Sequence, residues 1–152
     1  MSCPAGKRVI SAGVVHTGPA ANAGEFVLDD LRISGSLTSV TASSHEDQDG
    51  TTANWAVVAH AVCAFPPPGL ELVTATGPRD SVSSKTTVAG CPAGKAVLGA
   101  GGEITSGFGE VRFTTVLPIA FFGDGAFVSA AEDQDGTAAA WDIKAYAVCA
   151  TA

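Results

Sequence analysis

Residues 141–150 read Trp-Asp-Ile-Lys-Ala-Tyr-Ala-Val-Cys-Ala, and two kinds of side chain alternate along them. The apolar set consists of Trp141, Ile143, Ala145, Ala147 and Cys149. The other set begins with Asp142, Lys144 and Tyr146. A period of two is typical of a β-strand with one face in the core and the other in water. We therefore expect a half-buried strand whose polar face is solvated.

A similar strand occurs earlier in the chain, as part of an internal repeat. Trp55 corresponds to Trp141, and Ala-Val-Cys-Ala occurs at 61–64 and again at 147–150. Cys-Pro-Ala-Gly-Lys occurs at 3–7 and 91–95, and Glu-Asp-Gln-Asp-Gly-Thr at 46–51 and 132–137. We interpret these matches as a duplication, with a first β unit at 1–64, a connector at 65–90 and a second β unit at 91–152. We expect them to form one compact domain.

The composition also favours strands. Ala, Gly, Val and Thr are abundant, whereas the helix-forming residues Leu, Met, Lys and Arg are sparse. Apolar runs bounded by turn residues predict further strands at 8–16, 25–33, 37–43, 95–105, 110–117 and 126–131, with two in the connector at 70–76 and 85–89. Units of about 62 residues rarely bury enough surface alone. We therefore expect an all-β fold, a β-sandwich or β-prism-like arrangement of two antiparallel units that share one core.

Charge and hydropathy argue against two kinds of partner. The formal net charge is −7, whereas nucleic-acid binders carry basic patches, so we expect no nucleic-acid partner. The sequence has no apolar run that approaches the ~20 residues of a transmembrane helix, so we expect no transmembrane segment.

The four cysteines occupy matching places in the two units. Cys3 and Cys91 precede the first strand of each unit, and Cys63 and Cys149 lie in the last strand. An even number of cysteines at repeated positions is typical of disulfides, which persist in oxidising compartments. Two symmetric pairings are open: Cys3–Cys63 with Cys91–Cys149, which we prefer, and Cys63–Cys91 with Cys3–Cys149. Both favour an extracellular protein. No signal peptide precedes Met1, so we expect that an export signal has been removed and a start methionine added.

These motifs resemble those of a module common in exported actinobacterial proteins. The similarity rests on Cys-Pro-Ala-Gly-Lys at the start of each unit and on Tyr-Ala-Val-Cys-Ala at 146–150. It extends to the connector, with Pro-Pro-Pro-Gly-Leu-Glu-Leu-Val at 66–73 and Lys85 ahead of Cys91. The resemblance implies an extracellular, disulfide-bonded β repeat, and it implies no activity. The first unit departs from the pattern at His60, where the second unit has Tyr146.

The repeated acidic segment has two interpretations. Carboxylates two residues apart in a loop that contains glycine can converge on a Ca²⁺ ion. The ligands would then be Asp47 and Asp49 in the first unit and Asp133 and Asp135 in the second. The alternative is a hairpin turn, because Asp-Gly between two strands is a strong turn signal. We favour the turn and keep Ca²⁺ as a candidate cofactor.

Residues that differ between the units are candidates for a ligand-binding role. They are His16, His45, His60, Tyr146, Phe121 and Phe122. His45 precedes two acidic residues, an arrangement that general acid–base chemistry can use. Phe121 and Phe122 belong to an apolar stretch, 117–125, that can dock a partner, line a pocket for a small apolar ligand or lie in the core. The sequence contains no Gly-x-Ser-x-Gly motif, so we assign no catalytic residue.

The sequence therefore favours a non-catalytic extracellular binding module for a carbohydrate or another cell-envelope ligand. One alternative is a small cyclase- or isomerase-like enzyme with an apolar pocket inside the β fold, which would use His16 or His45. The other is a structural, self-assembling surface protein in which Phe121 and Phe122 form the contact.

Overall fold

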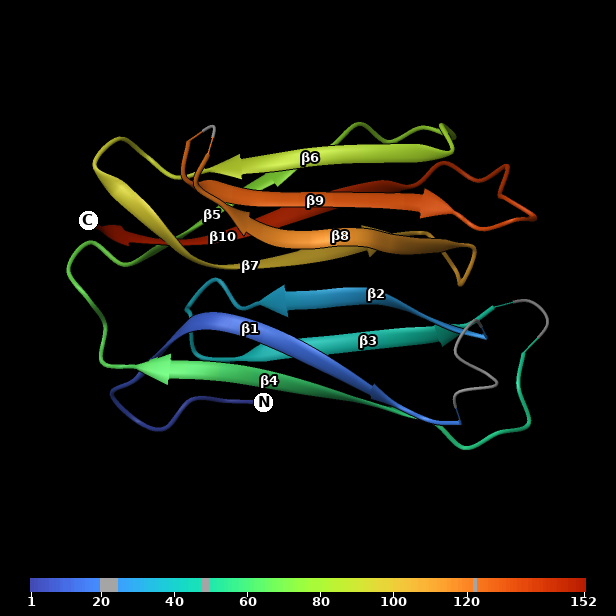
Figure 1. The fold of residues 1–152 in the computed structure, drawn as a ribbon, viewed down its shortest axis with the longest axis horizontal. Helices are drawn as coiled ribbons and strands as arrows, with labels where there is room; N and C mark the ends of the chain where they lie inside the picture. Colours follow the sequence, from blue (N-terminus) through green and yellow to red (C-terminus); the bar gives the residue numbers. More distant parts are fainter. Residues whose placement is uncertain (20–24, 48–49, 122) are drawn as a thin grey trace.

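The computed structural model describes residues 1–19, 25–47, 50–121 and 123–152. In these ranges the chain forms ten strands and no helix (Figure 1). The strands are β1 (Arg8–Thr17), β2 (Phe26–Ile33), β3 (Val40–Glu46), β4 (Ala56–Ala64), β5 (Glu71–Thr76), β6 (Ser84–Gly90), β7 (Lys95–Thr105), β8 (Val111–Ile119), β9 (Gly125–Glu132) and β10 (Asp142–Thr151). Accordingly, the described part has no helix that is long and apolar enough to span a membrane. The all-β prediction is confirmed.

Each strand expected from the sequence is present, and the largest difference in bounds concerns β3. The pattern predicts a strand at 37–43, whereas β3 begins at Val40. Leu37 has a left-handed backbone, with φ of 56°, and its N–H donates to the carbonyl of Ser34 at 2.8 Å. Leu37 is therefore a turn residue, although its side chain is buried. Because this buried turn residue is apolar, it extends the apolar pattern of the neighbouring strand in the sequence.

The strands form three antiparallel sheets. Their orders are β1-β4, β3-β2-β7-β10-β5 and β6-β9-β8. Corresponding segments pair alike in the two units, because β1 pairs with β4 as β7 does with β10, and β2 with β3 as β8 does with β9. Asp30 and Leu31 of β2 pair with β7, which joins the first unit, in the lower half of Figure 1, to the second. The duplication itself stays a prediction.

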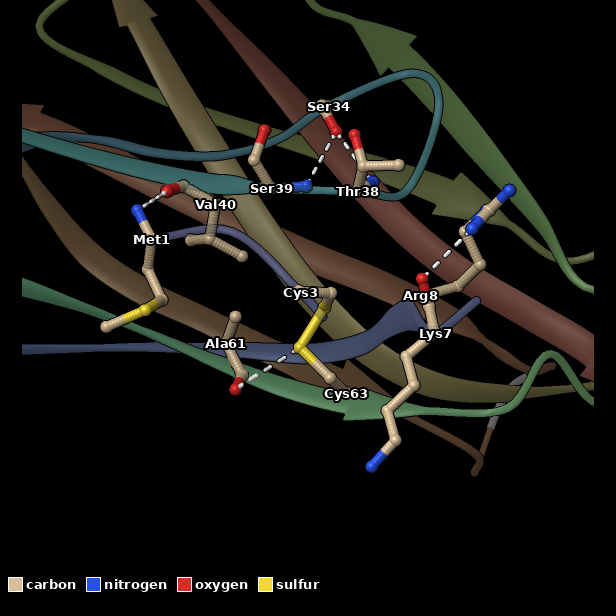
Figure 2. Close-up of a disulfide and its surroundings, with 10 residues drawn as sticks. All are labelled: Met1, Cys3, Lys7, Arg8, Ser34, Thr38, Ser39, Val40, Ala61 and Cys63. Atoms are coloured by element: carbon tan, nitrogen blue, oxygen red, sulfur yellow. Dashed lines mark hydrogen bonds between the residues drawn. A yellow bond between two sulfur atoms is a disulfide. The ribbon is translucent and has the colours of Figure 1, made fainter. Parts of the chain in front are cut away.

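In each unit a disulfide joins the segment before the first strand to the last strand. The two disulfides join Cys3 to Cys63, as Figure 2 shows, and Cys91 to Cys149, so the preferred pairing is confirmed. The linked residues are 60 and 58 positions apart. Closing loops of this length contributes on the order of 4 kcal/mol each in the chain-entropy model. Two such bonds are consistent with an oxidising environment.

Strand β10 is buried on both faces. Ile143, Ala145 and Ala147 belong to one apolar cluster, which β6, β8 and β9 complete. Tyr146 and Val148 belong to a second cluster, which is completed mainly by residues of the first unit, among them Leu31 and Ile33 of β2. The prediction that the face with Asp142, Lys144 and Tyr146 is solvated is therefore wrong. Tyr146 is buried because residues of the first unit pack against it, Asp142 is buried beside Arg79 of the connector, and Lys144 is partly exposed.

Glycines in β7 allow other strands to come close to the central sheet. A Cβ atom at Gly99 would lie 2.6 Å from the Cα atom of Ser11 in β1, and one at Gly101 would lie 2.4 Å from the carbonyl oxygen of Leu31 in β2. Real Cβ atoms essentially never approach backbone so closely. Gly101 lies inside the paired strand β7, opposite Tyr146 of β10. Position 101 requires a glycine because the backbone of β2 in the first unit passes too close for a Cβ atom.

We expect Gly101→Ala to destabilise the protein by about 1–3 kcal/mol or more, because the added methyl group overpacks a contact with backbone. Gly90→Ala is the matched control, since a Cβ at Gly90 would meet no atom within 4 Å. Urea unfolding of both variants with intact disulfides measures the difference. Equal stabilities would show that the contact between β7 and β2 is looser than described.

Candidate functional site

The repeated acidic segments have the same structural role in both units. Glu46 Oε1 accepts the indole N–H of Trp55 at 2.7 Å, and Glu132 Oε1 accepts that of Trp141 at 2.9 Å. Each glutamate thus fixes the tryptophan nine residues later, at the start of the last strand of its unit. Because the same bond is present in both units, it explains why the glutamate is repeated, and no ligand is needed to explain it.

The aspartates that follow shape the turns. Asp47 Oδ1 accepts the N–H of Gly50 at 3.1 Å, and Asp133 Oδ1 accepts the N–H groups of Asp135 and Gly136 at 3.1 and 3.0 Å. Such bonds are typical of Asx turns. Asp49 lies outside the described residues. Within residues 1–19, 25–47, 50–121 and 123–152, no group of three or more His, Cys, Asp or Glu is placed to hold a metal ion. Ca²⁺ stays a prediction.

The two acidic turns meet at one end of the molecule, around Glu110. Its carbonyl accepts the N–H of Asp133 at 2.9 Å, and a Cβ at the neighbouring Gly109 would lie 2.5 Å from the carbonyl oxygen of Glu46. Partial burial raises the pKa of Glu110, and the charges of Asp133, Asp135 and Asp47 raise it further. The ionised side chain therefore opposes folding at neutral pH.

We expect Glu110→Gln to raise the melting temperature at pH 7. The pKa of Glu110 is higher in the folded state than its usual value of 4.5, so stability falls as the pH rises from this value through the folded-state pKa. The advantage of the variant should vanish below about pH 4, where the group is protonated in both states. The advantage should also shrink in 1 M salt, where the screening length is about 3 Å and the repulsion from the aspartates is weaker. Thermal unfolding from pH 3 to 8 measures both effects; a variant no more stable than the wild type at pH 7 would contradict the assignment.

A second polar cluster crosses the central sheet where the two units join. We call it the charged seam, and it consists of Asp29, Asp30, Arg32, His45, Glu103, Lys144 and Tyr146. The seam extends across four neighbouring strands. Glu103 of β7 lies opposite both Lys144 of β10 and Asp30 of β2, and His45 belongs to β3. The seam therefore combines residues of both units.

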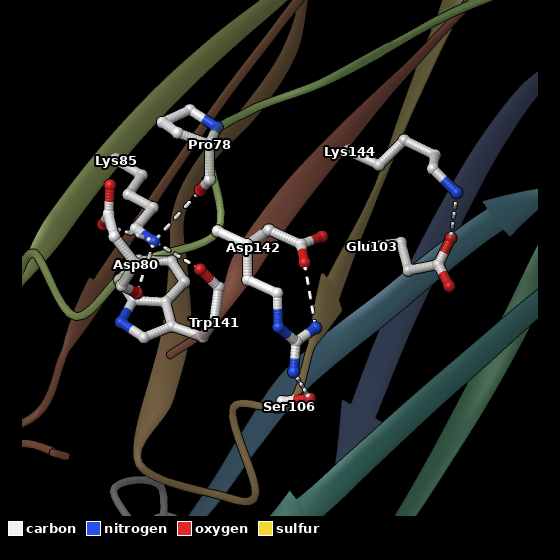
Figure 3. A network of polar contacts seen from close by, with 9 residues as sticks. Pro78, Asp80, Lys85, Glu103, Ser106, Trp141, Asp142 and Lys144 are labelled. Atoms are coloured by element: carbon white, nitrogen blue, oxygen red, sulfur yellow. Dashed lines mark hydrogen bonds and ion pairs between the residues drawn. The ribbon is translucent and has the colours of Figure 1, made fainter. Parts of the chain in front are cut away.

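Glu103 is the centre of the seam. It accepts a hydrogen bond from the Tyr146 hydroxyl and lies 3.5 Å from Lys144 Nζ and 3.4 Å from Arg32 Nη1. Figure 3 shows the pair with Lys144. Burial alone raises the pKa of Glu103, but the bond from Tyr146 and the charges of Lys144 and Arg32 outweigh it and lower the pKa. Glu103 is therefore ionised at neutral pH, and burial together with this carboxylate raises the pKa of Tyr146.

Asp29 and Asp30 occupy a less favourable environment. Only 8% and 9% of their surfaces are exposed. Asp29 Oδ2 lies 2.8 Å from His45 Nδ1, and Asp30 Oδ2 lies 3.5 Å from Arg32 Nη2. Burial raises the pKa of both carboxyl groups. It outweighs the contact with His45, which lowers the pKa of Asp29, and the Arg32 charge and the Ser43 hydrogen bond, which lower that of Asp30. The Oδ1 atom of each is buried and has no hydrogen-bond partner in the part of the chain that the structure describes.

The other candidate residues are dispersed. His16 Nε2 lies 2.5 Å from Ser44 Oγ, and burial lowers the pKa of His16. His60 is exposed on β4. Phe121 is 94% exposed at the turn between β8 and β9, and Phe122 lies outside the described residues. Of the six ligand-binding candidates, only His45 and Tyr146 belong to the seam.

Two further cations have structural roles. Lys85 is buried, and its Nζ donates to the carbonyls of Pro78, Asp80 and Trp141 while it pairs with Asp80 Oδ1 at 2.9 Å (Figure 3). Arg79 joins the connector to Asp142 of β10 at 3.1 Å and to Ser106 at 2.7 Å. Both side chains attach the connector to the start of β10.

Sequence reasoning missed most of the seam. One local signal was present, because adjacent aspartates in the middle of a strand, as at 29 and 30, are unusual. Glu103 gave no such signal, since its partners lie in other strands, and the contact of Arg32 with Glu103 likewise joins two strands. A further sign of asymmetry is that the second unit has Ala130 and Ala131 before Glu132, where the first has Ser44 and His45 before Glu46.

Comparison of the chain with protein-family models, with curated proteins and with solved structures gives no match.

Proposed function

We propose that the protein is a non-catalytic extracellular binding module that binds a polyhydroxylated ligand, a carbohydrate of the cell envelope or its surroundings, at the charged seam. The observation that carries the proposal is the pair of buried acceptors, Asp29 Oδ1 and Asp30 Oδ1, without partners among the described residues. Buried polar atoms without a partner are rare, and each such atom opposes folding. Both atoms are closed to solvent in the structure, so a sugar hydroxyl that donates to them must first displace the half-exposed side chain of Arg32 or His45.

The groups beside these acceptors suit the same ligand. Arg32 and His45 have about half of their side chains exposed, at 45% and 54%. Arg32 makes its ion pairs at 3.5 and 3.4 Å, longer than the roughly 2.7–2.9 Å of a strong charge-assisted bond. Its guanidinium can therefore turn to a ligand without losing a strong contact. Donors and acceptors side by side match hydroxyl groups, which both donate and accept.

We expect the variant Asp29→Asn/Asp30→Asn to lose carbohydrate binding at least tenfold while its melting temperature at pH 7 stays equal or rises. The stability should not fall, because burial already disfavours the two charges. Glu110→Gln is the matched control, since it removes a carboxylate whose pKa is likewise raised and which is not part of the seam. A glycan array with the wild type selects the ligand, and calorimetry with that glycan measures the variants.

Two results would contradict the proposal. One is a wild type that retains no glycan on an array of envelope and extracellular polysaccharides. The other is a double variant that binds as well as the wild type and Glu110→Gln.

An enzymatic function is the second candidate, and two contacts favour it. If His45 Nδ1–H donates to Asp29, its Nε2 is free to accept a proton, as in a general base. His16, whose pKa burial lowers, lies beside the Ser44 hydroxyl. Turnover of a glycan by the wild type that His45→Ala or His16→Ala abolishes would establish this function. Binding without turnover would favour the module.

A further inference from the structure

Two strand edges that the connector covers in the second unit have no such cover in the first unit. In the second unit, β6 pairs with β9 and β5 pairs with β10. The corresponding strands of the first unit are β3 and β4, and within the described ranges their strand neighbours are β2 and β1 alone. The outer edges of β3 and β4 are thus open to described strands where the connector lies on the second unit.

The open part of the β3 edge begins after Val40. Met1 and Val40 exchange two backbone hydrogen bonds of 2.9 Å, and Ala89 and Ala126 occupy the matching positions on the second unit. Both pairs lie two residues before the repeated cysteine and six residues before the repeated glutamate. From its pair, β6 continues along the whole of β9, whereas no described strand follows β3 beyond Val40.

The backbone groups on this edge are those that the connector binds in the second unit. Because the direction of the backbone groups alternates along a strand, the N–H groups of Ala42, Ser44 and Glu46 point to the same side as that of Val40. In the second unit, the N–H of Glu132, which corresponds to Glu46, donates to the carbonyl of Ser83 at 2.9 Å. The β3 edge therefore presents a row of donors and acceptors in the register of a further antiparallel strand.

Strand β4, all of which the structure describes, lacks the usual protection of an edge. It is nine residues long, and its sequence at 56–64 contains no charged residue other than a histidine, no proline and no glycine. The irregularity in its pairing with β1 comes from an extra residue on β1, Ile10, so β4 itself is not bulged. A long, regular and uncharged edge is the kind that pairs with a further strand.

The repeated tryptophans indicate which side chain the added strand carries. Trp141 is fully buried, and Lys85 Nζ lies 4.2 Å from the centroid of its ring and donates to its carbonyl (Figure 3). Lys85 lies opposite Ala130 in the register of β6 and β9. Since Ser44 corresponds to Ala130, a β6-like strand on β3 has its lysine opposite Ser44, near Trp55, which is partly exposed. An ammonium group over an indole ring is a favourable contact.

We propose that the open edges of β3 and β4 bind an extended, lysine-containing segment of another polypeptide, with the sequence pattern of residues 70–90. The segment adds one strand to each edge, as the connector does on the second unit. Backbone hydrogen bonds supply the affinity of such strand addition, and side chains supply its specificity. The proposal does not depend on carbohydrate binding at the seam.

Calorimetry of a synthetic peptide with the sequence of residues 70–90 against the whole, disulfide-bonded protein tests the proposal. The connector of the protein outcompetes the peptide on the second unit, because a linked segment acts at an effective concentration of the order of mM. We expect a single class of sites with a Kd below about 1 mM. A peptide with Lys85→Met should bind at least about tenfold more weakly, because it lacks the charged donor.

The edge itself is tested by Ala42→Pro, which removes a donor and should also weaken binding at least about tenfold. Thr86→Pro is the matched control on β6. The bond between Glu132 and Ser83 shows that odd-numbered residues of β6 face β9, so the N–H of Thr86 points away from it. Circular dichroism establishes that both variants are folded. Hydrogen–deuterium exchange should show that the peptide protects amides of β3 and β4.

A wild type that does not bind the peptide at about 1 mM would overturn the proposal. So would binding that the peptide with Lys85→Met reproduces at full affinity, or binding that leaves the amides of β3 and β4 unprotected. Protection of these amides, together with weaker binding of the altered peptide and unchanged binding by Thr86→Pro, would support it.

Discussion

The rest of the structure depends on β10, a strand that is buried on both faces. Ile143, Ala145 and Ala147 complete the core of the second unit, and Tyr146 and Val148 complete that of the first. A unit of about 60 residues buries only about 60% of the surface that its unfolded chain exposes, so its stability alone is marginal. The first unit avoids this limit because the central sheet closes its core, and the β7 glycines allow the close approach that this requires.

The fold was largely predictable from the sequence, because strand patterns and cysteine positions are local. The alternation along 141–150 predicted the strand correctly. The matching cysteines left two symmetric disulfide pairings open, and the structure has the preferred one. Whether a strand face is buried or exposed was not predictable, because this depends on whether the other unit packs against it. Val62 and Val148 are the same residue at corresponding positions, and one is exposed while the other is buried. Tyr146 was assigned to water for the same reason.

The candidate site was predictable only in part. His45 and Tyr146 stood out because they differ from their counterparts in the other unit, Ala131 and His60. Their partners did not, since Asp29 is recognisable as a partner of His45 only when β2 and β3 are paired, and Glu103 as a partner of Tyr146 only when β7 and β10 are. The repeated acidic segment, the most conspicuous motif in the sequence, binds tryptophans and shapes turns. Repetition marked residues that the fold needs, whereas differences between the units marked only His45 and Tyr146 of the seam.

We infer that the first unit is stable only against the face of β10 that carries Tyr146 and Val148, so both units unfold together. Hydrogen–deuterium exchange of the disulfide-bonded protein in increasing urea tests this inference, because it reports on separate strands. We expect amides of β1 and β4 to lose protection at the same urea concentration as those of β8 and β9. Loss of protection in β1 and β4 at a clearly lower urea concentration, with β8, β9 and β10 still protected, would contradict it.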